Sequence, residues 1–297
     1  MRTASAGARL KAAHKNSFPL VSPLAHDALS ARLIERAGFK SFDVGGNAML
    51  AARYGLPDLG LAGLGEMADG IRDIVQATDL PVLVDGDDGY GDVKSVVRMI
   101  ETYEAMGVAG ILLEDQIRES KQPGAATARG VAPLNLFESK LRAALDARRD
   151  KDFVIIGRTD AFGAVGLDEA LRRGERFLKL GADGVFVAGL KTMKDYEAVG
   201  AAFRGQWNSA TVFQATATPW LSPAELHAMG FSQVAYPNLL IGRVAKAIDH
   251  CLSRLSDFAK DGGGVFDGSD GELALESLRE AVQLKRWGAI EETYNQV

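Results

Sequence analysis

Cysteine is almost absent from this chain: Cys251 is the only one among 297 residues. A single cysteine excludes an internal disulfide and is typical of a reducing compartment, so we expect a cytoplasmic protein. Long apolar runs are absent as well. No stretch approaches the roughly 18 apolar residues of a membrane-spanning helix. Residues 1–18 lack the apolar core of a signal peptide. We therefore expect no membrane partner.

An excess of positive charge is also missing. The 34 lysines and arginines are outnumbered by 39 aspartates and glutamates, which gives a formal net charge of −5. No overall field favours nucleic acid, and we expect none as a partner. No G-x-G-x-x-G motif opens a helix after the first predicted strand, which argues against a dinucleotide-binding fold. What remains is an ordinary globular composition, 47% hydrophobic and 25% charged.

Eight short apolar runs alternate with longer amphipathic stretches along the chain. Apolar residues recur at three- and four-residue spacing in stretches such as 92–107 and 167–181, as in helices that bury one face. Strands that alternate with helices predict a (β/α)8 barrel of the TIM type or a doubly wound sheet, and the missing nucleotide motif favours the barrel. The expected strands are 18–24, 41–46, 81–87, 110–116, 153–160, 184–189, 210–216 and 233–238.

A Gly- and Asp-rich segment separates the barrel from the end of the chain. We assign residues 1–256 to the barrel, and 257–297 to this linker and a last helical stretch, 272–294. A helix beyond a closed barrel needs tertiary packing of its apolar face to be stable. It packs either on its own barrel or on a neighbouring subunit, and composition does not distinguish the two.

Polar residues gather where three of the predicted strands end. In a (β/α)8 barrel the carboxyl ends of the strands carry the active site in essentially every characterised enzyme. A carboxylate in an otherwise apolar run is costly to bury unless it is paired or binds a metal ion. A purely structural ion pair is the alternative for any one residue, but three adjacent strands together predict a site. The residues are Asp85 and Asp87 after the third strand, Glu114 and Asp115 after the fourth, and Arg158 and Asp160 after the fifth.

These strand-end carboxylates offer only oxygen atoms as metal ligands. No histidine or cysteine lies beside them, which favours Mg²⁺, with Mn²⁺ or Ca²⁺ as alternatives, over zinc or copper. A calcium-binding EF-hand loop starting at Asp85 needs glycine and glutamate at its sixth and twelfth positions, where this chain has Tyr90 and Val96. The sequence therefore predicts a Mg²⁺ site held by a few carboxylates and water.

Three further features are suited to an anionic substrate. Arg158 is a cation that can hold a carboxylate or a phosphonate, or form a salt bridge to Glu114 or Asp160. The glycines of the run 44–48 leave backbone N–H groups accessible at a helix start, where they can hold a carboxylate or simply form a turn. Asp58, in the connection that follows, can lie over the barrel mouth.

Together these stretches resemble the phosphoenolpyruvate mutase/isocitrate lyase superfamily, and the pattern is most similar to its 2-methylisocitrate lyase branch. The resemblance implies a (β/α)8 barrel, commonly a homotetramer in which the last helix is swapped onto a neighbour. It also implies Mg²⁺ bound by Asp85 and Asp87, with Glu114 supporting it through water. The matching segments are 25–39, 55–60, 80–92, 110–116, 152–162, 217–226 and 235–237.

The same resemblance assigns the substrate-binding and catalytic roles. Gly45, Gly46 and Asn47 would contact the carboxylate of a 2-oxo acid, although family members usually carry serine where Gly45 stands. Arg158 would stabilise the enolate of a pyruvate-like fragment, and Asp58 would lie beside the reacting centre. Contacts that strengthen as charge develops are those that accelerate a reaction.

The chain also departs from the family pattern. The loop that carries a catalytic cysteine in the lyases corresponds to residues 117–133, which contain Lys121 but neither cysteine nor histidine. Ala188 and Gly242 stand where the family has a glutamate and an arginine. These departures argue against a tricarboxylate substrate. They leave the half of the site that binds a 2-oxo carboxylate and stabilises an enolate.

We therefore expect a Mg²⁺-dependent carbon–carbon lyase acting on a small 2-oxo or 2-hydroxy carboxylate. Decarboxylation of an oxaloacetate-type acid ranks first and cleavage of a malate-type acid second, with Lys121, Tyr90 or water as the proton donor. The alternative enzyme breaks a carbon–phosphorus bond, as a mutase or a phosphonopyruvate hydrolase does. The alternative from another class is a barrel that binds a metabolite without catalysis.

Overall fold

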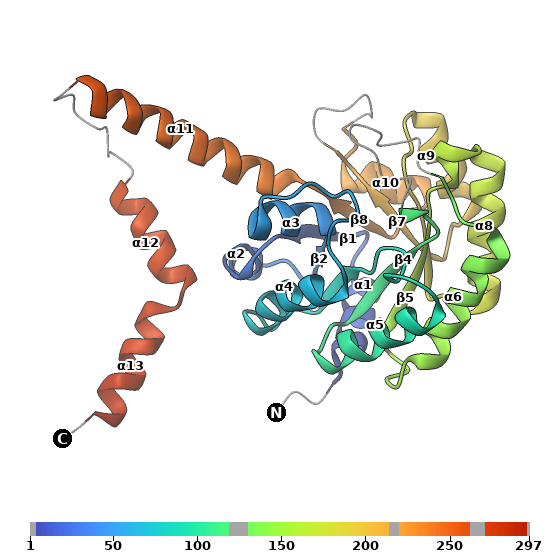
Figure 1. Cartoon of the computed structure of the whole chain (residues 1–297), viewed down its shortest axis with the longest axis horizontal. Helices are drawn as coiled ribbons and strands as arrows, with labels where there is room; N and C mark the ends of the chain where they lie inside the picture. Colours follow the sequence, from blue (N-terminus) through green and yellow to red (C-terminus); the bar gives the residue numbers. More distant parts are fainter. Residues whose placement is uncertain (1–3, 119–129, 214–219, 262–270, 296–297) are drawn as a thin grey trace.

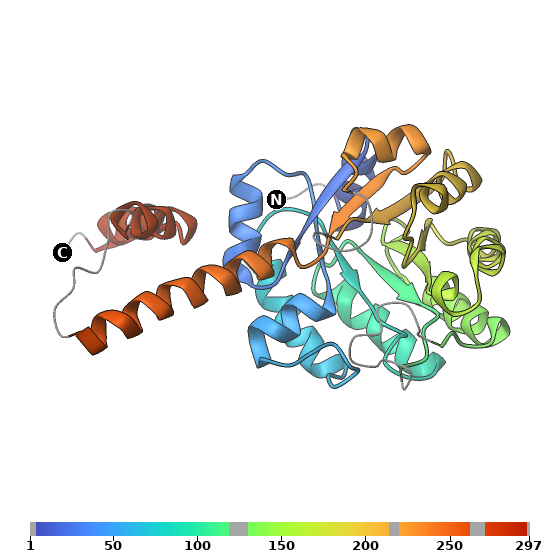
Figure 2. The ribbon, with the colours of Figure 1, turned by 90° about the horizontal axis from the view of Figure 1, so that it is seen from above.

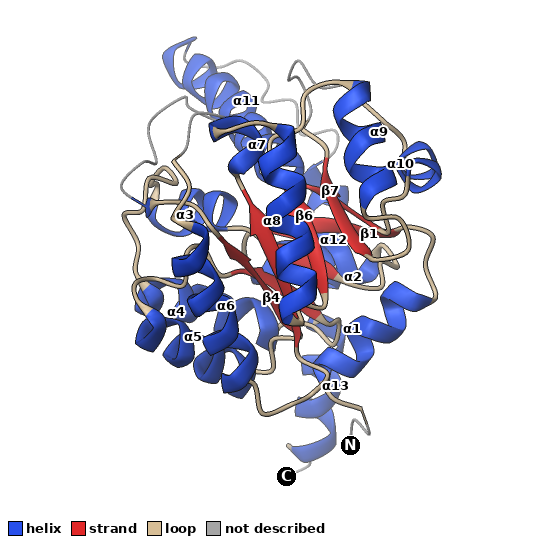
Figure 3. Cartoon of the chain, turned by 90° about the vertical axis from the view of Figure 1, so that its right-hand side faces the viewer, coloured by secondary structure: helices blue, strands red, loops and turns tan. Residues whose placement is uncertain are grey.

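The predicted (β/α)8 barrel is present. The computed structural model describes residues 4–118, 130–213, 220–261 and 271–295. Eight parallel strands close into a ring in sequence order, from β1 to β8. Helices surround this ring (Figures 1 and 3). The strands are β1 Leu20–Ala25, β2 Phe42–Val44, β3 Val82–Asp85, β4 Gly110–Glu114, β5 Val154–Thr159, β6 Gly184–Val187, β7 Trp207–Thr211 and β8 Gln233–Tyr236.

Most of the helices lie on the outside of the ring or at its two ends, and the last three extend away from it. They are α1 Ala6–Lys15, α2 Ala28–Arg36, α3 Gly46–Tyr54, α4 Leu64–Gln76, α5 Val93–Ala105, α6 Leu134–Ala147, α7 Ala161–Ala164, α8 Leu167–Leu180, α9 Met193–Ala202, α10 Pro223–Met229, α11 Leu239–Asp261, α12 Gly271–Ala281 and α13 Leu284–Tyr294. None of the described helices is both long and apolar enough to cross a membrane.

The N-terminal helix α1, which the sequence pattern did not predict, closes the end of the barrel opposite the predicted site. Leu10 of α1 is fully buried in the same cluster as Leu20 and Leu83, which face the barrel interior. Gly7 lies against the segment before β5, and a Cβ there would meet the carbonyl oxygen of Asp152 at 2.1 Å. Only glycine permits this close approach.

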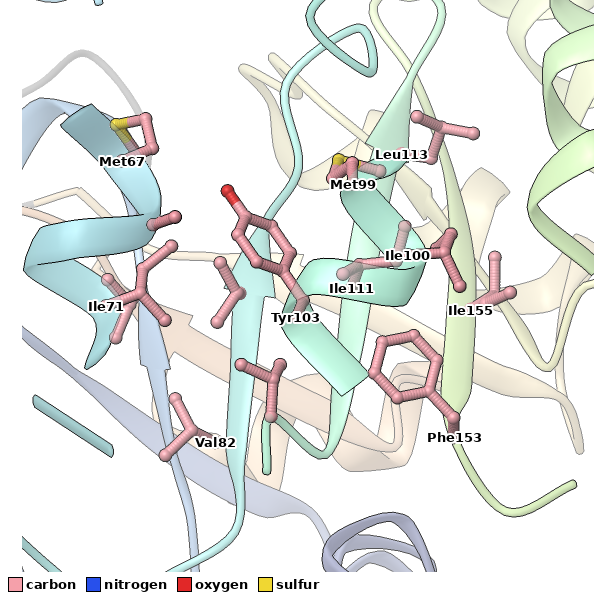
Figure 4. Packing of buried hydrophobic residues seen from close by; sticks show 14 of the residues in the cluster. Met67, Ile71, Val82, Met99, Ile100, Tyr103, Ile111, Leu113, Phe153 and Ile155 are labelled. Atoms are coloured by element: carbon pink, nitrogen blue, oxygen red, sulfur yellow. The ribbon is translucent and has the colours of Figure 1, made fainter. Parts of the chain in front are cut away.

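A second apolar layer lies between the strands and their covering helices (Figure 4). Ile71 of α4 and Tyr103 of α5 are fully buried against Val82 and Ile111 of the neighbouring strands. Burying each such side chain contributes roughly 1.5–3 kcal/mol, so this layer fixes the strands and the side chains that they carry.

Strand β7 begins three residues earlier than the sequence predicted. The expected range was 210–216, whereas the strand is Trp207–Thr211, and residues 214–216 lie outside the described residues. The first residues of β7 form side-chain hydrogen bonds inside the barrel and do not continue an apolar run. Trp207 Nε1 donates to Gln233 Oε1 at 2.8 Å, and Ser209 Oγ donates to the same oxygen at 2.9 Å.

The C-terminal segment extends away from the barrel (Figures 1 and 2). Helix α11 continues to Asp261, past residue 256, where we placed the end of the barrel. The predicted helical stretch 272–294 is two helices, α12 and α13, separated at Gln283, which has a left-handed φ of 58°. Helix α12 contacts α2, where Arg36 Nη1 lies 3.3 Å from Glu280 Oε2.

Candidate active site

The alternation of side chains along the strands places three predicted residues inside the barrel mouth. Leu83 of β3 and Ile156 of β5 belong to the inner cluster. Because alternate residues of a strand point to the same side, Asp85 and Arg158 also face inward, one step nearer the carboxyl ends. Glu114 is the register partner of Arg158 on β4 and faces the same way.

Arg158 lies at the centre of this site and contacts three carboxylates. Its Nη1 is 2.8 Å from Glu114 Oε2 and 3.6 Å from Asp85 Oδ2. Its Nε and Nη2 donate to the two oxygens of Asp160 at 3.0 and 3.2 Å. Burial alone would lower the pKa of Arg158. The combined effect of the three carboxylates is larger, and the pKa lies well above its usual value. Arg158 is thus a permanent cation, and both salt bridges considered from the sequence are present.

Asp87 lies in a strained turn that joins the ends of β3 and β4. Its φ of 47° is left-handed, a conformation that aspartate adopts more readily than most residues. Its N–H donates to Asp85 Oδ1 at 3.0 Å, and its carbonyl accepts from the N–H of Glu114 at 2.9 Å. The three predicted metal ligands are therefore held together by one residue's backbone.

A second cation, Arg118, lies beside this turn and was not singled out from the sequence. Its Nη2 is 2.8 Å from Asp88 Oδ1 and 3.8 Å from Asp87 Oδ2. Its Nη1 donates to the carbonyl of Ala62 at 3.2 Å. Lys140 of α6 also binds the turn, donating to the carbonyl of Asp88 at 2.7 Å. Nothing in the sequence spacing links these four separate segments.

Asp58 lies half-buried in the connection between α3 and α4. Two residues later, the carbonyl of Gly60 accepts from Arg118 Nη1 at 3.5 Å. A Cβ at Gly60, whose φ is 73°, would meet Arg118 Cγ at 2.9 Å, so glycine allows the approach. Arg118 thereby ties the connection that carries Asp58 to the end of β3.

The predicted carboxylate-binding run starts a helix at the correct end of the barrel. Gly45 is the N-cap of α3 and Gly46 its first residue, and no described side chain caps this helix. The first N–H groups of α3 are therefore available to an anion. Asn47 is exposed, and its Nδ2 donates to Oδ1 of Asn238, which follows β8, at 3.2 Å.

Two side chains were considered as proton donors, and only one of them is among the described residues. Lys121 lies outside these residues. Tyr90 is described, but its hydroxyl lies 3.0 Å from that of Tyr103, which is buried in the outer layer. Burial, followed by the effects of Tyr103 and Asp87, raises the pKa of Tyr90 well above its usual value. Tyr90 is thus a weak acid directed into the outer core.

Asp115, grouped with the strand-end residues from the sequence, has a structural role. It faces outward from β4 and is fully buried. Its carboxylate accepts from Thr159 Oγ1 at 2.7 Å and from the N–H of Asp160 at 2.9 Å. Arg173 of α8 lies 2.9 Å away and offsets the charge. Asp115 and Arg173 thus form a buried ion pair on the outer side of the barrel, the alternative considered for any one strand-end residue.

A further carboxyl inside the barrel, Asp43 of β2, was missed by the sequence reasoning. Gln233 Nε2 lies 3.2 Å from each of its oxygens. Burial raises the pKa of Asp43 well above its usual value; a hydrogen bond from Ser22 opposes this rise and the charge of Asp85 adds to it. The available signal was an aspartate inside an apolar run, one inward position before the glycines.

The strand-end carboxylates suit a hard divalent cation because every donor is oxygen. Among the residues that the structure describes, no three acidic, histidine or cysteine side chains form a compact metal cluster. Arg158 instead lies between Asp85 and Glu114. Mg²⁺ usually keeps several waters and uses one or two carboxylates, so a pair such as Asp85 and Asp87 would be enough to hold it.

Similarity to known proteins extends over nearly the whole chain. The family model described as phosphoenolpyruvate phosphomutase matches residues 10–256. The 2,3-dimethylmalate lyase of Eubacterium barkeri is 34% identical over 266 residues, which cover 88% of this chain and 91% of that protein. A structure of oxaloacetate acetylhydrolase with 3,3-difluorooxalacetate has a TM-score of 0.88 at 30% identity and covers 97% of both chains.

A structure of phosphonopyruvate hydrolase with oxalate and Mg²⁺ has a TM-score of 0.83 at 28% identity, and it covers 98% of this chain and 99% of that one. The matches therefore include proteins named for dimethylmalate, for oxaloacetate and for phosphonopyruvate. The barrel, the strand-end carboxylates and these matches agree. This chain belongs to the phosphoenolpyruvate phosphomutase family, within the PEP mutase/isocitrate lyase superfamily.

Proposed function

We propose that this protein is a Mg²⁺-dependent carbon–carbon lyase that acts on a small 2-oxo or 2-hydroxy carboxylate through an enolate. The observation that carries the proposal is the contact of Arg158 with Asp85 and Glu114 at the ends of three adjacent strands. A fixed cation among carboxylates can hold an oxyanion and a divalent cation side by side. The relatives named for dimethylmalate and oxaloacetate support this substrate class.

Different residues of the site would bind the metal ion and the substrate. Asp85 and Asp87 would hold Mg²⁺, with Glu114 accepting from one of its waters, and the bound cation would polarise a substrate oxygen. Arg158 donates to the oxyanion that develops as the carbon–carbon bond breaks, and this contact strengthens in the transition state. The N–H groups at the start of α3 hold the substrate carboxylate.

Three further residues complete the proposed site. Asn47, held by Asn238, contacts the same carboxylate as Gly45 and Gly46. Asp58 acts beside the reacting centre, where Arg118 holds its connection. Lys121 is proposed to act from the segment between β4 and α6, and it lies outside the described residues.

The distal part of the substrate should be small. Ala188 is buried in the inner cluster and supplies no charge to a third carboxylate. Decarboxylation of an oxaloacetate-type acid and cleavage of a malate-type acid both fit, because both break a carbon–carbon bond and leave an enolate. The likeness to phosphonopyruvate hydrolase supports a carbon–phosphorus bond enzyme as the second candidate, with Arg158 binding the phosphonate.

A substrate screen separates these functions. The protein is incubated with oxaloacetate, 2,3-dimethylmalate, 2-methylisocitrate or phosphonopyruvate, in Mg²⁺ or in EDTA, and release of 2-oxo acid and of phosphate is followed. We expect Mg²⁺-dependent cleavage of oxaloacetate or a malate-type acid. Arg158→Gln at the same Mg²⁺ concentration controls for spontaneous decarboxylation. Phosphate release alone favours the carbon–phosphorus enzyme, and no turnover of any acid refutes both.

We also propose that the protein is a homotetramer in which the segment 257–297 packs on a neighbouring subunit. Helix α11 carries five large apolar side chains that are 38–57% exposed. Their spacing of three or four residues places them on one face of the helix. A continuous exposed apolar face indicates a partner surface. These residues are Val244, Ile248, Leu252, Leu255 and Phe258.

A further inference from the structure

Asp43 is a buried carboxyl whose partners are all neutral. Only 6% of the residue is exposed. Both oxygens accept from Gln233 Nε2 at 3.2 Å, and Ser22 forms the other hydrogen bond. No lysine, arginine or histidine among the described residues forms an ion pair with it, in contrast to Asp115, which Arg173 offsets at 2.9 Å. A buried carboxylate without a cation is costly, and such a group takes up a proton instead.

The orientation of Gln233 follows from its other partners. Its Oε1 accepts from Trp207 Nε1 at 2.8 Å, and an indole nitrogen can only donate. The amide nitrogen must therefore face Asp43 and Ser22, where it lies 3.1 Å from Ser22 Oγ. Because this amide donates to both oxygens of Asp43, the hydrogen of the neutral acid is free to point to Ser22 or into the barrel mouth.

Asp43 lies on the floor of the proposed active site. It faces inward one position before Gly45, where the carboxylate-binding run begins, and two residues of a strand span roughly 6.6 Å. Its register partner on β3 is Leu83, one inward position before Asp85. A substrate held at Gly45, beside the proposed metal ligand Asp85, therefore lies above this acid. The elements around it present Ser22 from β1, Asp85 from β3 and Gln233 from β8.

We propose that Asp43 is the general acid that protonates the carbanion left by carbon–carbon cleavage, the role for which this chain has no loop cysteine. The inference rests on the proposed lyase function. In decarboxylation of a 2-oxo acid, the carbon–carbon bond breaks, CO₂ leaves and the electron pair of the bond remains as the enolate. A new C–H bond forms at the former bonding carbon as the O–H bond of Asp43 breaks. The product leaves, and the Asp43 carboxylate regains a proton from water.

Two variants test this assignment. Asp43→Asn keeps the shape of the side chain and its contact with Gln233 but cannot donate a carboxyl proton. General acid catalysis contributes roughly 10²–10⁴-fold, so we expect kcat to fall at least about 100-fold. KM should stay within about threefold, since the carboxylate cradle is untouched. Ser22→Ala removes the hydrogen bond that lowers the pKa of Asp43, so the alkaline limb of the kcat–pH profile should move to higher pH.

The outcomes separate this inference from the function on which it rests. If the wild-type protein turns over no 2-oxo or 2-hydroxy acid, the proposed function fails and the role of Asp43 fails with it. If the wild type is active and Asp43→Asn keeps its kcat, only the assignment of Asp43 is overturned. If Asp43→Asn does not fold, Ser22→Ala provides the test. An alkaline limb of its kcat–pH profile at the same pH as in the wild type also overturns the assignment of Asp43.

Discussion

Replacing Arg158 with glutamine should destabilise the metal-free protein and make it depend on Mg²⁺. The substitution removes the cation that Glu114, Asp85 and Asp160 share at distances of 2.8–3.6 Å. Glu114 is almost fully buried, with 1% of its side chain exposed, and water cannot replace the lost partner. Breaking a buried pair by removing one partner costs about 3–5 kcal/mol.

That free energy translates into a measurable shift in melting temperature. Globular proteins gain roughly 2.1 cal/mol/K per residue on unfolding, which for a chain of this length is about 0.6 kcal/mol/K. We therefore expect Arg158→Gln to melt roughly 5–8 °C below the wild type in EDTA. Mg²⁺ should restore much of this loss, because a divalent cation offsets the same carboxylates and binds only the folded state.

Thermal denaturation in EDTA and in saturating Mg²⁺ measures both effects. Arg148→Gln is the matched control, because Arg148 forms a comparable half-buried pair with Asp183 at 2.7 Å, close to the opposite end of the barrel. It should lose stability equally with and without Mg²⁺. The reasoning is refuted if Arg158→Gln melts with the wild type in EDTA, or if Mg²⁺ stabilises both variants alike.

Three further predictions follow from other contacts. Arg118→Gln should lower kcat more than about tenfold, because it frees the connection held at Gly60; steady-state kinetics at a temperature where the variant is folded measure this, and an unchanged kcat contradicts it. Burial lowers the pKa of His14 to about 4, so stability should fall as pH drops from 6.5 toward 4, while the unfolded chain takes up a proton and the folded chain does not. His14→Phe, which keeps an aromatic ring on Trp207, should remove this part of the pH dependence in chemical denaturation, and parallel curves would argue against it. Leu252→Glu, on the exposed face of α11, should lower the mass measured by light scattering toward that of a monomer, and an unchanged mass contradicts the proposed interface.

The barrel and the gathering of charged residues at its strand ends could be read from the sequence because both leave local patterns. Alternating strand and helix signals predicted eight strands, and all eight are present. The start of β7 was predicted three residues too late because its first residues do not form an apolar run. Trp207 and Ser209 are instead held by Gln233, which lies on another strand. Periodicity reports burial against neighbours in general, and it cannot identify a specific hydrogen bond across the barrel.

Residues that act through long-range contacts escaped prediction for the same reason. Arg118 was not singled out within the loop 117–133, although it binds segments 58 residues and 30 residues earlier in the chain. Asp43 sits in an apolar run whose inward face is known only once the register with β3 is known. Helix α1 gives a weak apolar signal because only one of its side chains, Leu10, enters the core deeply. Sequence spacing identifies neighbours along an element, whereas these roles depend on neighbours in space.

Titration calorimetry with Mg²⁺ on the wild type and on Asp87→Asn tests the central claim most directly. Asp92→Asn is the control, because Asp92 caps α5 by accepting from the N–H groups of Lys94 and Ser95 and pairs with the Lys94 ammonium at 3.0 Å. The account predicts saturable binding of one Mg²⁺ per chain to the wild type and to Asp92→Asn, with binding and Mg²⁺-dependent carbon–carbon cleavage both lost in Asp87→Asn. Undiminished Mg²⁺ binding or turnover in Asp87→Asn would contradict it.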